Sequence, residues 1–223
     1  MQKVSDNLLF WLKWPLALGA LVCLPGLLSA WSHQILGADQ INGLLPVFAG
    51  VLGYGLLWGM LFRRRQAGSF LPTFFHELSH GFMALLTFHR VGGLRASWSD
   101  GGRVTIYGGT NWLILVAPYF FPLVPILGAT CVLLGPQEWN QASLCGFGVT
   151  VSFYCFALAS DIHSKQTDLQ AVGFPFAWFF LPSANLLALG SVIATTVGGT
   201  AGLSGFIEES YWSSYQWMSL LLD

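Results

Sequence analysis

Charged side chains are scarce in this chain of 223 residues: they make up 9% of it, whereas hydrophobic residues make up 54%. Soluble domains carry about 25% charge. The composition therefore excludes an ordinary soluble protein and leaves no room for a separate soluble domain. The net charge of −1 also argues against nucleic acid as a partner, because such binding depends on basic surfaces. We predict a single membrane-embedded domain over residues 1–223, in contact with the lipid bilayer.

Cysteine is also sparse, and its four residues all lie in apolar segments; they are Cys23, Cys131, Cys145 and Cys155. Their spacings match no zinc pattern and suggest no disulfide framework. This excludes a cysteine-rich metal site. We predict that the four thiols are free and behave as small buried hydrophobic residues.

Long apolar runs are abundant, and five of them have about the 20 residues needed to cross a bilayer core. They span about residues 8–31, 44–62, 111–135, 143–162 and 176–199. A sixth and shorter run covers about residues 70–88. The pattern predicts an all-α polytopic membrane protein with about five crossing helices and one partly inserted helix. From Ser204 onward, apolar and aromatic residues recur at helical spacing, which predicts an interfacial helix.

The basic residues predict the orientation, because cytoplasmic loops concentrate Lys and Arg. They are Lys3, Lys13, Arg63, Arg64, Arg65, Arg90, Arg95, Arg103 and Lys165. If the five long runs cross and the 70–88 helix does not fully cross, all nine fall on the cytoplasmic side. The N-terminus is then cytoplasmic, and the 31–43 loop and the C-terminal tail lie outside.

The shorter run contains the pattern His76-Glu77-Leu78-Ser79-His80. On a helix, residues four apart share a face, so His76 and His80 can direct both imidazoles at one Zn²⁺. Glu77 lies beside them, where it can take a proton from a water molecule that the metal activates. Ionisable residues inside a membrane are costly and mark functional sites. The pattern therefore favours a zinc hydrolase site over two histidines packed on an apolar helix.

A catalytic zinc needs a third protein ligand. The orientation places several candidates outside, namely His33, Glu138, Glu208 and Glu209. His89 is expected about two and a half turns beyond His80 on the same helix, too far to share the metal. Asp161, His163 and Asp168 remain, near the cytoplasmic end of the 143–162 segment. We predict Asp168 as the ligand and Asp161 as the second choice, the alternative for either being a solvated loop carboxylate.

The segment 92–107 follows the HELSH helix and contains the pair Asp100-Gly101, a hairpin-turn signal flanked by short runs with β-forming residues. It predicts a β-hairpin, with an ordinary polar connector as the alternative.

The stretch from Phe74 to Thr87, with Arg90-Val91 and Asp100-Gly101-Gly102 after it, resembles the small bacterial site-2 protease-type zinc metallopeptidases that lack a PDZ domain. Residues 166–170 weakly resemble the place where such proteins carry their acidic ligand, although the chain has no Leu-Asp-Gly or Asn-Pro-Asp-Gly motif. The resemblance implies a zinc site in the membrane near the cytoplasmic face. It also implies a β-structured loop that holds an unwound substrate, and it suggests location in a bacterial inner membrane.

We therefore predict an intramembrane zinc endopeptidase that cleaves a membrane protein or peptide substrate in or next to a transmembrane segment. Glu77 is the predicted base, and Zn²⁺ is held by His76, His80 and Asp168. The predicted substrate-binding residues Val104, Thr105 and Ile106 lie in the hairpin, which can pair with an extended substrate strand.

Two other functions compete with this prediction. A non-catalytic membrane scaffold or chaperone could retain the metal site, and the sequence separates it poorly from a protease because Glu77 is intact. A metal transporter would need several ionisable residues along its crossings, and only Lys13 is found near an end. Asn185, the only intramembrane Asn considered as a second oxyanion donor, is better explained by a helix–helix hydrogen bond. The oligomeric state is left open.

Overall fold

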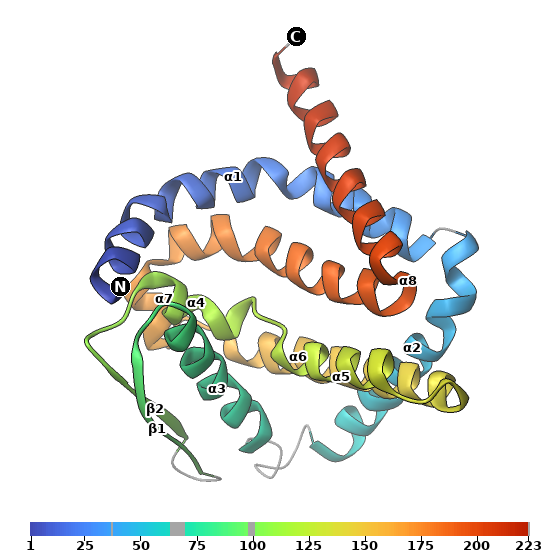
Figure 1. Cartoon of the computed structure of the whole chain (residues 1–223), viewed down its shortest axis with the longest axis horizontal. Coiled ribbons are helices and arrows are strands. Elements are labelled where there is room, and N and C mark those ends of the chain that lie inside the picture. Colours follow the sequence, from blue (N-terminus) through green and yellow to red (C-terminus); the bar gives the residue numbers. More distant parts are fainter. Residues whose placement is uncertain (37, 63–69, 98–100, 223) are drawn as a thin grey trace.

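Long apolar helices make up most of the molecule. The computed structural model describes residues 1–36, 38–62, 70–97 and 101–222 (Figure 1). Four helical stretches of this described chain are long and apolar enough to cross a bilayer, at residues 2–34, 43–60, 137–161 and 174–220. The helices concerned are α1 (Gln2–Leu36), α2 (Ala38–Leu57), α6 (Asn140–Asp161) and α8 (Phe174–Leu222). The π-helical turn η1 (Trp58–Phe62) extends α2, and the 3-10 turn η4 (Gln137–Trp139) precedes α6.

The predicted crossing over residues 111–135 is broken rather than straight. It consists of α4 (Trp112–Val116), the 3-10 turn η3 (Ala117–Tyr119) and α5 (Leu123–Leu134), and its two parts are bent by 64°. Pro118 and Pro122 lie at the break, where each removes a backbone donor that a continuous helix would need. Counted as one span, this pair brings the number of crossings to five, so the predicted fold class is confirmed.

Helix α8 changes direction at Gly199, whose φ of 62° suits a residue without Cβ. The tail after it is helical as expected. One side of the tail is buried, at Phe206, Ser210, Ser213 and Ser214. Ser214 Oγ bonds to the Cys23 carbonyl of α1, so the tail is packed along α1 as well as being amphipathic.

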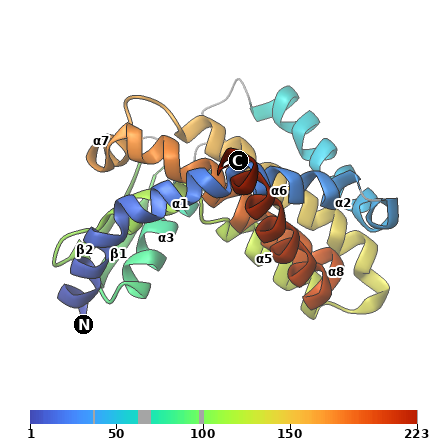
Figure 2. The same ribbon diagram turned by 90° about the horizontal axis from the view of Figure 1, so that it is seen from above.

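The remaining elements gather at one end of the molecule, away from α2 (Figures 1 and 2). They are α3 (Phe70–Leu86), β1 (Arg90–Ala96), β2 (Gly102–Tyr107) and α7 (Thr167–Val172). The two strands pair antiparallel, with Arg95 opposite Arg103 and an irregularity between Val91 and Gly93. The predicted hairpin is thus confirmed, although Asp100 of its turn lies outside the described residues, as do Arg63, Arg64 and Arg65.

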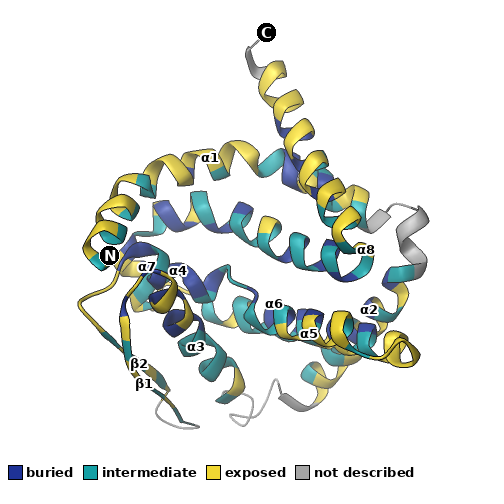
Figure 3. Ribbon diagram, viewed as in Figure 1, coloured by how far each residue is buried: buried dark blue, intermediate teal, exposed yellow. Residues whose placement is uncertain are grey.

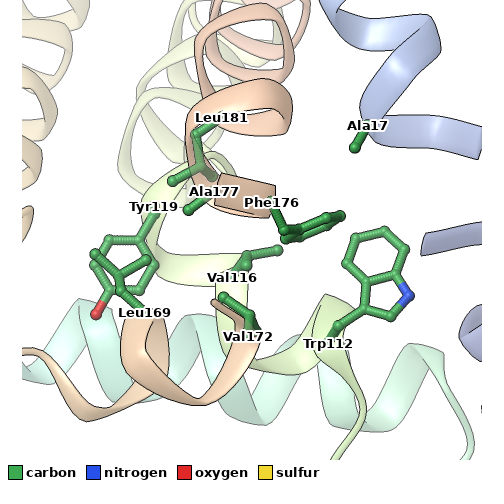
Figure 4. Packing of buried hydrophobic residues seen from close by; sticks show 9 residues of the cluster. All are labelled: Ala17, Trp112, Val116, Tyr119, Leu169, Val172, Phe176, Ala177 and Leu181. Atoms are coloured by element: carbon green, nitrogen blue, oxygen red, sulfur yellow. The ribbon is translucent and has the colours of Figure 1, made fainter. Parts of the chain in front are cut away.

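The apolar core and the surface follow the logic of a membrane protein. One cluster joins α1, α4, α7 and α8 through side chains that include Ala17, Trp112 and Phe176 (Figure 4). Much of α1 is exposed (Figure 3). The four cysteines are free, but three of them are exposed and Cys145 is half-buried, so the prediction of burial was wrong. An apolar thiol in a membrane helix gains little from burial, because lipid is as apolar as the protein core.

Candidate metal centre

Helix α3 presents two imidazoles on one face, and each ring is oriented by a partner on its Nδ1 atom. His80 Nδ1 lies 2.7 Å from the Ile114 carbonyl oxygen, and His76 Nδ1 lies 3.0 Å from Asp161 Oδ2. Both partners accept hydrogen bonds, so in each neutral ring Nδ1 carries the proton and Nε2 carries a lone pair. Hydrogen bonds of this kind are the usual way in which proteins orient metal-binding histidines.

The two free imidazole nitrogens meet a carboxylate oxygen. His76 Nε2 and His80 Nε2 are 3.2 Å apart, and Asp168 Oδ2 lies 3.6 Å from the first and 3.3 Å from the second. Three lone pairs at such distances repel one another unless a cation lies between them. Zinc binds His N and carboxylate O at about 2.0–2.2 Å in a tetrahedral arrangement, so its ligand atoms lie roughly 3.3–3.5 Å apart. The three residues therefore fit a zinc ion in both donor type and spacing.

Asp168 reaches the site from the first turn of α7. Its Oδ2 also lies 3.4 Å from the Tyr119 hydroxyl, which donates to it. Burial alone would raise the pKa of Asp168, but when no metal is bound and the imidazoles of His76 and His80 are protonated, their hydrogen bonds and charges hold that pKa below its ordinary value. The carboxyl group is thus kept ionised, as a metal ligand must be.

The other candidates for the third ligand are placed differently. Asp161 contacts the outer nitrogen of His76, so it supports that ring instead of completing the cluster. His163 is exposed, and its Nδ1 accepts the Lys165 backbone N–H. His89 is not on the helix of His80 as expected, because α3 ends at Leu86. Phe88 adopts a positive φ of 64°, which turns the chain toward β1.

Glu77 faces a cavity of about 470 Å³ that is shared by α3, the hairpin and α7. The three candidate zinc ligands, His76, His80 and Asp168, also line this cavity. Val104 and Ile106 of β2 also line this cavity, whereas Thr105 does not and is exposed. Gly102 lies so close that a Cβ there would be 2.5 Å from Glu77 Cγ. The hairpin therefore packs directly on the predicted base.

The sequence did not predict two groups at this site, the Ile114 carbonyl and Tyr119, but it did predict the role of Asn185. The Ile114 carbonyl, which orients His80, carries no signal in sequence because any residue has a carbonyl. Tyr119 lay inside an expected continuous crossing, and only the break at Pro118 and Pro122 brings it to Asp168. Asn185 accepts from the Tyr154 hydroxyl and donates to the Tyr119 carbonyl. It serves as a connection between helices, the role that the sequence favoured.

The fold and this cluster define a membrane protein with a candidate metallohydrolase centre. A family model described as peptidase M50B-like, of the site-2 protease family, matches residues 50–211. The chain therefore belongs to this family of zinc-dependent membrane metallopeptidases. No PDZ domain is found. No curated protein and no solved structure matches the chain.

Proposed function

We propose that the chain is an intramembrane zinc endopeptidase of site-2 protease-like specificity. In this proposal it cleaves membrane proteins or peptides in or next to their transmembrane segments, near the cytoplasmic face. The observation that supports this most strongly is the meeting of His76 Nε2, His80 Nε2 and Asp168 Oδ2 beside a cavity lined by Glu77. A metalloprotease needs a metal site, a base and room for a peptide in one place, and this end of the molecule offers all three.

The chemistry divides between the metal and the chain. A zinc ion held by the three ligands would supply Lewis acidity, which polarises a peptide carbonyl and makes water more acidic. Glu77 accepts the proton of the attacking water and delivers it to the leaving amine. Asp161 and the Ile114 carbonyl keep the imidazoles turned toward the centre throughout. The closely packed hairpin limits the space in which the Glu77 carboxylate can move.

The hairpin also offers a way to hold an extended substrate. Strand β2 pairs with β1 on one edge only, and residues 101–104 in succession border the cavity. The Ser97 N–H donates to the Gly101 carbonyl, so the backbone groups of Gly101 point toward β1. In an antiparallel pair this direction alternates from one residue to the next, so the backbone groups of Arg103 and Thr105 also point toward β1. Those of Val104 and Ile106 then face the free edge. A substrate strand added there would satisfy backbone groups that lipid cannot.

The same proposal includes a location. Five basic residues lie in or next to the elements around the site, in the first turn of α1, in the hairpin and just before α7, namely Lys3, Arg90, Arg95, Arg103 and Lys165. The orientation rule assigns all five to the cytoplasm. We therefore infer an N-terminus in the cytoplasm. We also propose a single domain over residues 1–223 and, from the family resemblance, a bacterial inner membrane. A site at this end would have access to water, which hydrolysis consumes.

The decisive experiment measures cleavage of a membrane-embedded reporter peptide by purified protein loaded with zinc. We expect Glu77→Gln to lower the cleavage rate by at least about 10²-fold, the low end for loss of a general base, while the zinc content stays the same. Glu208→Gln, an exposed carboxylate in α8, is the matched control and should retain full activity. Activity of Glu77→Gln within a few-fold of wild type would refute the assigned base. A wild-type protein that binds zinc but cleaves no membrane peptide would favour the scaffold function instead.

A further inference from the structure

Helix α1 lies outside the family match, which begins at residue 50, yet its first turns contact residues at the end of β2, the start of α4 and the end of α7. Gln2 Nε2 donates to the Gly108 carbonyl just after β2 at 2.9 Å. Asp6 contacts the start of α4, and Lys13 contacts the end of α7. We propose that α1 is a positioning element whose Asp6 and Lys13 hold the ligands His80 and Asp168 in place. This inference rests on the proposed metal site.

A continuous series of hydrogen bonds through the start of α4 links Asp6 to His80. Asp6 Oδ1 accepts a hydrogen bond from Asn111 Nδ2 at 2.9 Å. Asn111 Oδ1 accepts the Ile114 N–H at 3.0 Å and so caps α4. The Ile114 carbonyl in turn accepts from His80 Nδ1 at 2.7 Å. The position of Asp6 therefore sets the position of the group that orients the ligand.

His89 strengthens the same connection. Its side chain is fully buried, and its Nε2 lies 3.4 Å from Asp6 Oδ1. That distance suits ion pairing, but the geometry gives Nε2 no hydrogen bond with the described part of the chain. The other nitrogen contacts Thr87. Asp6 is thus the polar partner that α1 supplies to a buried imidazole at the junction of α3 and β1.

Lys13 acts on the other ligand. Its ammonium donates to the Val172 carbonyl at 2.8 Å and lies 4.9 Å from the centroid of the Phe176 ring. Val172 is the last residue of α7, the helix that bears Asp168 in its first turn. The last carbonyls of a helix lack intrahelical partners, and a cation there is favourable.

The two supported helices need outside support because they are short. Helix α4 has five residues and α7 has six, whereas isolated helices shorter than about 12–15 residues are marginal. Their ends are therefore placed by tertiary contacts, and α1 supplies a polar contact to each. Loss of a group that contacts a metal ligand directly typically costs about 10- to 100-fold in metal affinity, and because Asp6 and Lys13 act one step further out, we expect losses at the low end of that range here.

The test is a zinc affinity measurement by chelator competition on the full-length protein in detergent. A cobalt absorption spectrum recorded alongside reports the ligand geometry. We expect Asp6→Ala and Lys13→Met each to weaken zinc binding by about 10-fold, the low end for outer partners, and to alter the cobalt spectrum, with helical content unchanged. Lys13→Arg should restore affinity, because it keeps a donor and a charge. Lys3→Met, exposed on the same helix, is the control and should behave as wild type.

If Asp6→Ala loses helical content, Asp6→Asn replaces it in the comparison. Asn keeps an oxygen for Asn111 but loses the charge beside His89, and it should show a smaller loss in the same direction. Wild-type affinity and cobalt spectrum in both the Asp6 and Lys13 variants would overturn the inference. Failure of the metal site itself is distinguishable, since His80→Ala would then also leave zinc binding unchanged.

Discussion

Different interactions hold the structural elements together at the two ends of this molecule. At the end formed by α3, the hairpin and α7, side chains with polar or charged groups bridge the elements, as in the contacts His76–Asp161 and Lys13–Val172. At the opposite end, α2 and α6 meet backbone to backbone. A Cβ on Gly50 would overlap the Cys145 carbonyl, and one on Gly148 would overlap the Val47 carbonyl.

The difference follows from the solvent. Lipid gives apolar side chains little reason to associate, so membrane helices associate through close van der Waals packing that small residues permit. Polar groups in the same environment are costly unless each has a partner. At the site end they include the ionisable side chains of the metal centre, whereas the α2–α6 contact adds the hydroxyl of Ser152, which donates to the Val51 carbonyl. The molecule thus separates a scaffold end, which depends on shape, from a site end, which depends on particular chemical groups.

The largest expected effect tests the site end directly. His76→Ala or His80→Ala should release zinc and abolish cleavage, because two remaining ligands cannot hold the ion well. Metal analysis of purified protein measures this, and circular dichroism should show unchanged helix content. His33→Ala, at the far end of α1, is the matched control, since His33 is exposed and contacts Glu209 instead. Equal zinc loss in His33→Ala would remove the distinction between the two ends.

The next effect separates two carboxylates within the site end. Asp168→Ala removes a proposed ligand, whereas Asp161→Ala removes only the partner of His76 Nδ1. We expect Asp168→Ala to lose most bound zinc and Asp161→Ala to weaken zinc affinity by about 10- to 100-fold. Chelator competition on both variants gives the order. The reverse order would mean that the ligand and its supporting carboxylate have been exchanged.

The residues of the site differ in how well the sequence alone predicts their roles. His76, Glu77 and His80 share one local pattern on one helix, so spacing alone predicts their association. We predicted Asp168 over Asp161 from the expected cytoplasmic position of this segment and from a weak family resemblance. The structure brings Asp168 to the two histidines. The role of Asp161 and the carbonyl of Ile114 depend on how three separate segments meet. Such contacts leave no periodic signal in a single sequence.

The fold was likewise predicted in part from the sequence. Length and hydropathy predicted the crossings, because a bilayer core sets how many apolar residues a span requires. They did not predict the 64° bend in the 111–134 region or the packing of the tail on α1. Both depend on tertiary contacts and on Pro and Gly positions that membrane helices also tolerate without a sharp bend.

A smaller effect is expected at the point where the hairpin meets the base. Gly102→Ala would place a methyl group 2.5 Å from Glu77 Cγ and 2.7 Å from Thr73 Cγ2, so Glu77 must move. We expect the cleavage rate to fall on the order of 10-fold, since small displacements of a catalytic group are costly, with zinc content unchanged. Gly93→Ala on the paired strand, where a Cβ meets nothing within 4 Å, should have no such effect. Equal rates for the two variants would mean that the hairpin does not constrain Glu77.

The smallest effect on the chemistry is expected at the scaffold end, where the fold itself should suffer. Gly146 and Gly148 lie two residues apart on α6, but only a Cβ on Gly148 would meet the α2 backbone, while one on Gly146 meets nothing within 4 Å. Gly148→Ala must push α2 and α6 apart, because a backbone carbonyl cannot rotate aside as a side chain can. Overpacking of this kind costs about 1–3 kcal/mol, and we expect Gly148→Ala to lower the unfolding temperature in detergent. Gly146→Ala should leave that temperature unchanged or raise it, since Ala favours a helix over Gly. Zinc bound per folded molecule and cleavage rate per bound zinc should stay at wild-type values in both variants, because the ligands and Glu77 lie at the other end. If Gly148→Ala instead lowers zinc affinity without lowering stability, packing at the scaffold end is transmitted to the metal centre, and the two ends cannot be treated as separate.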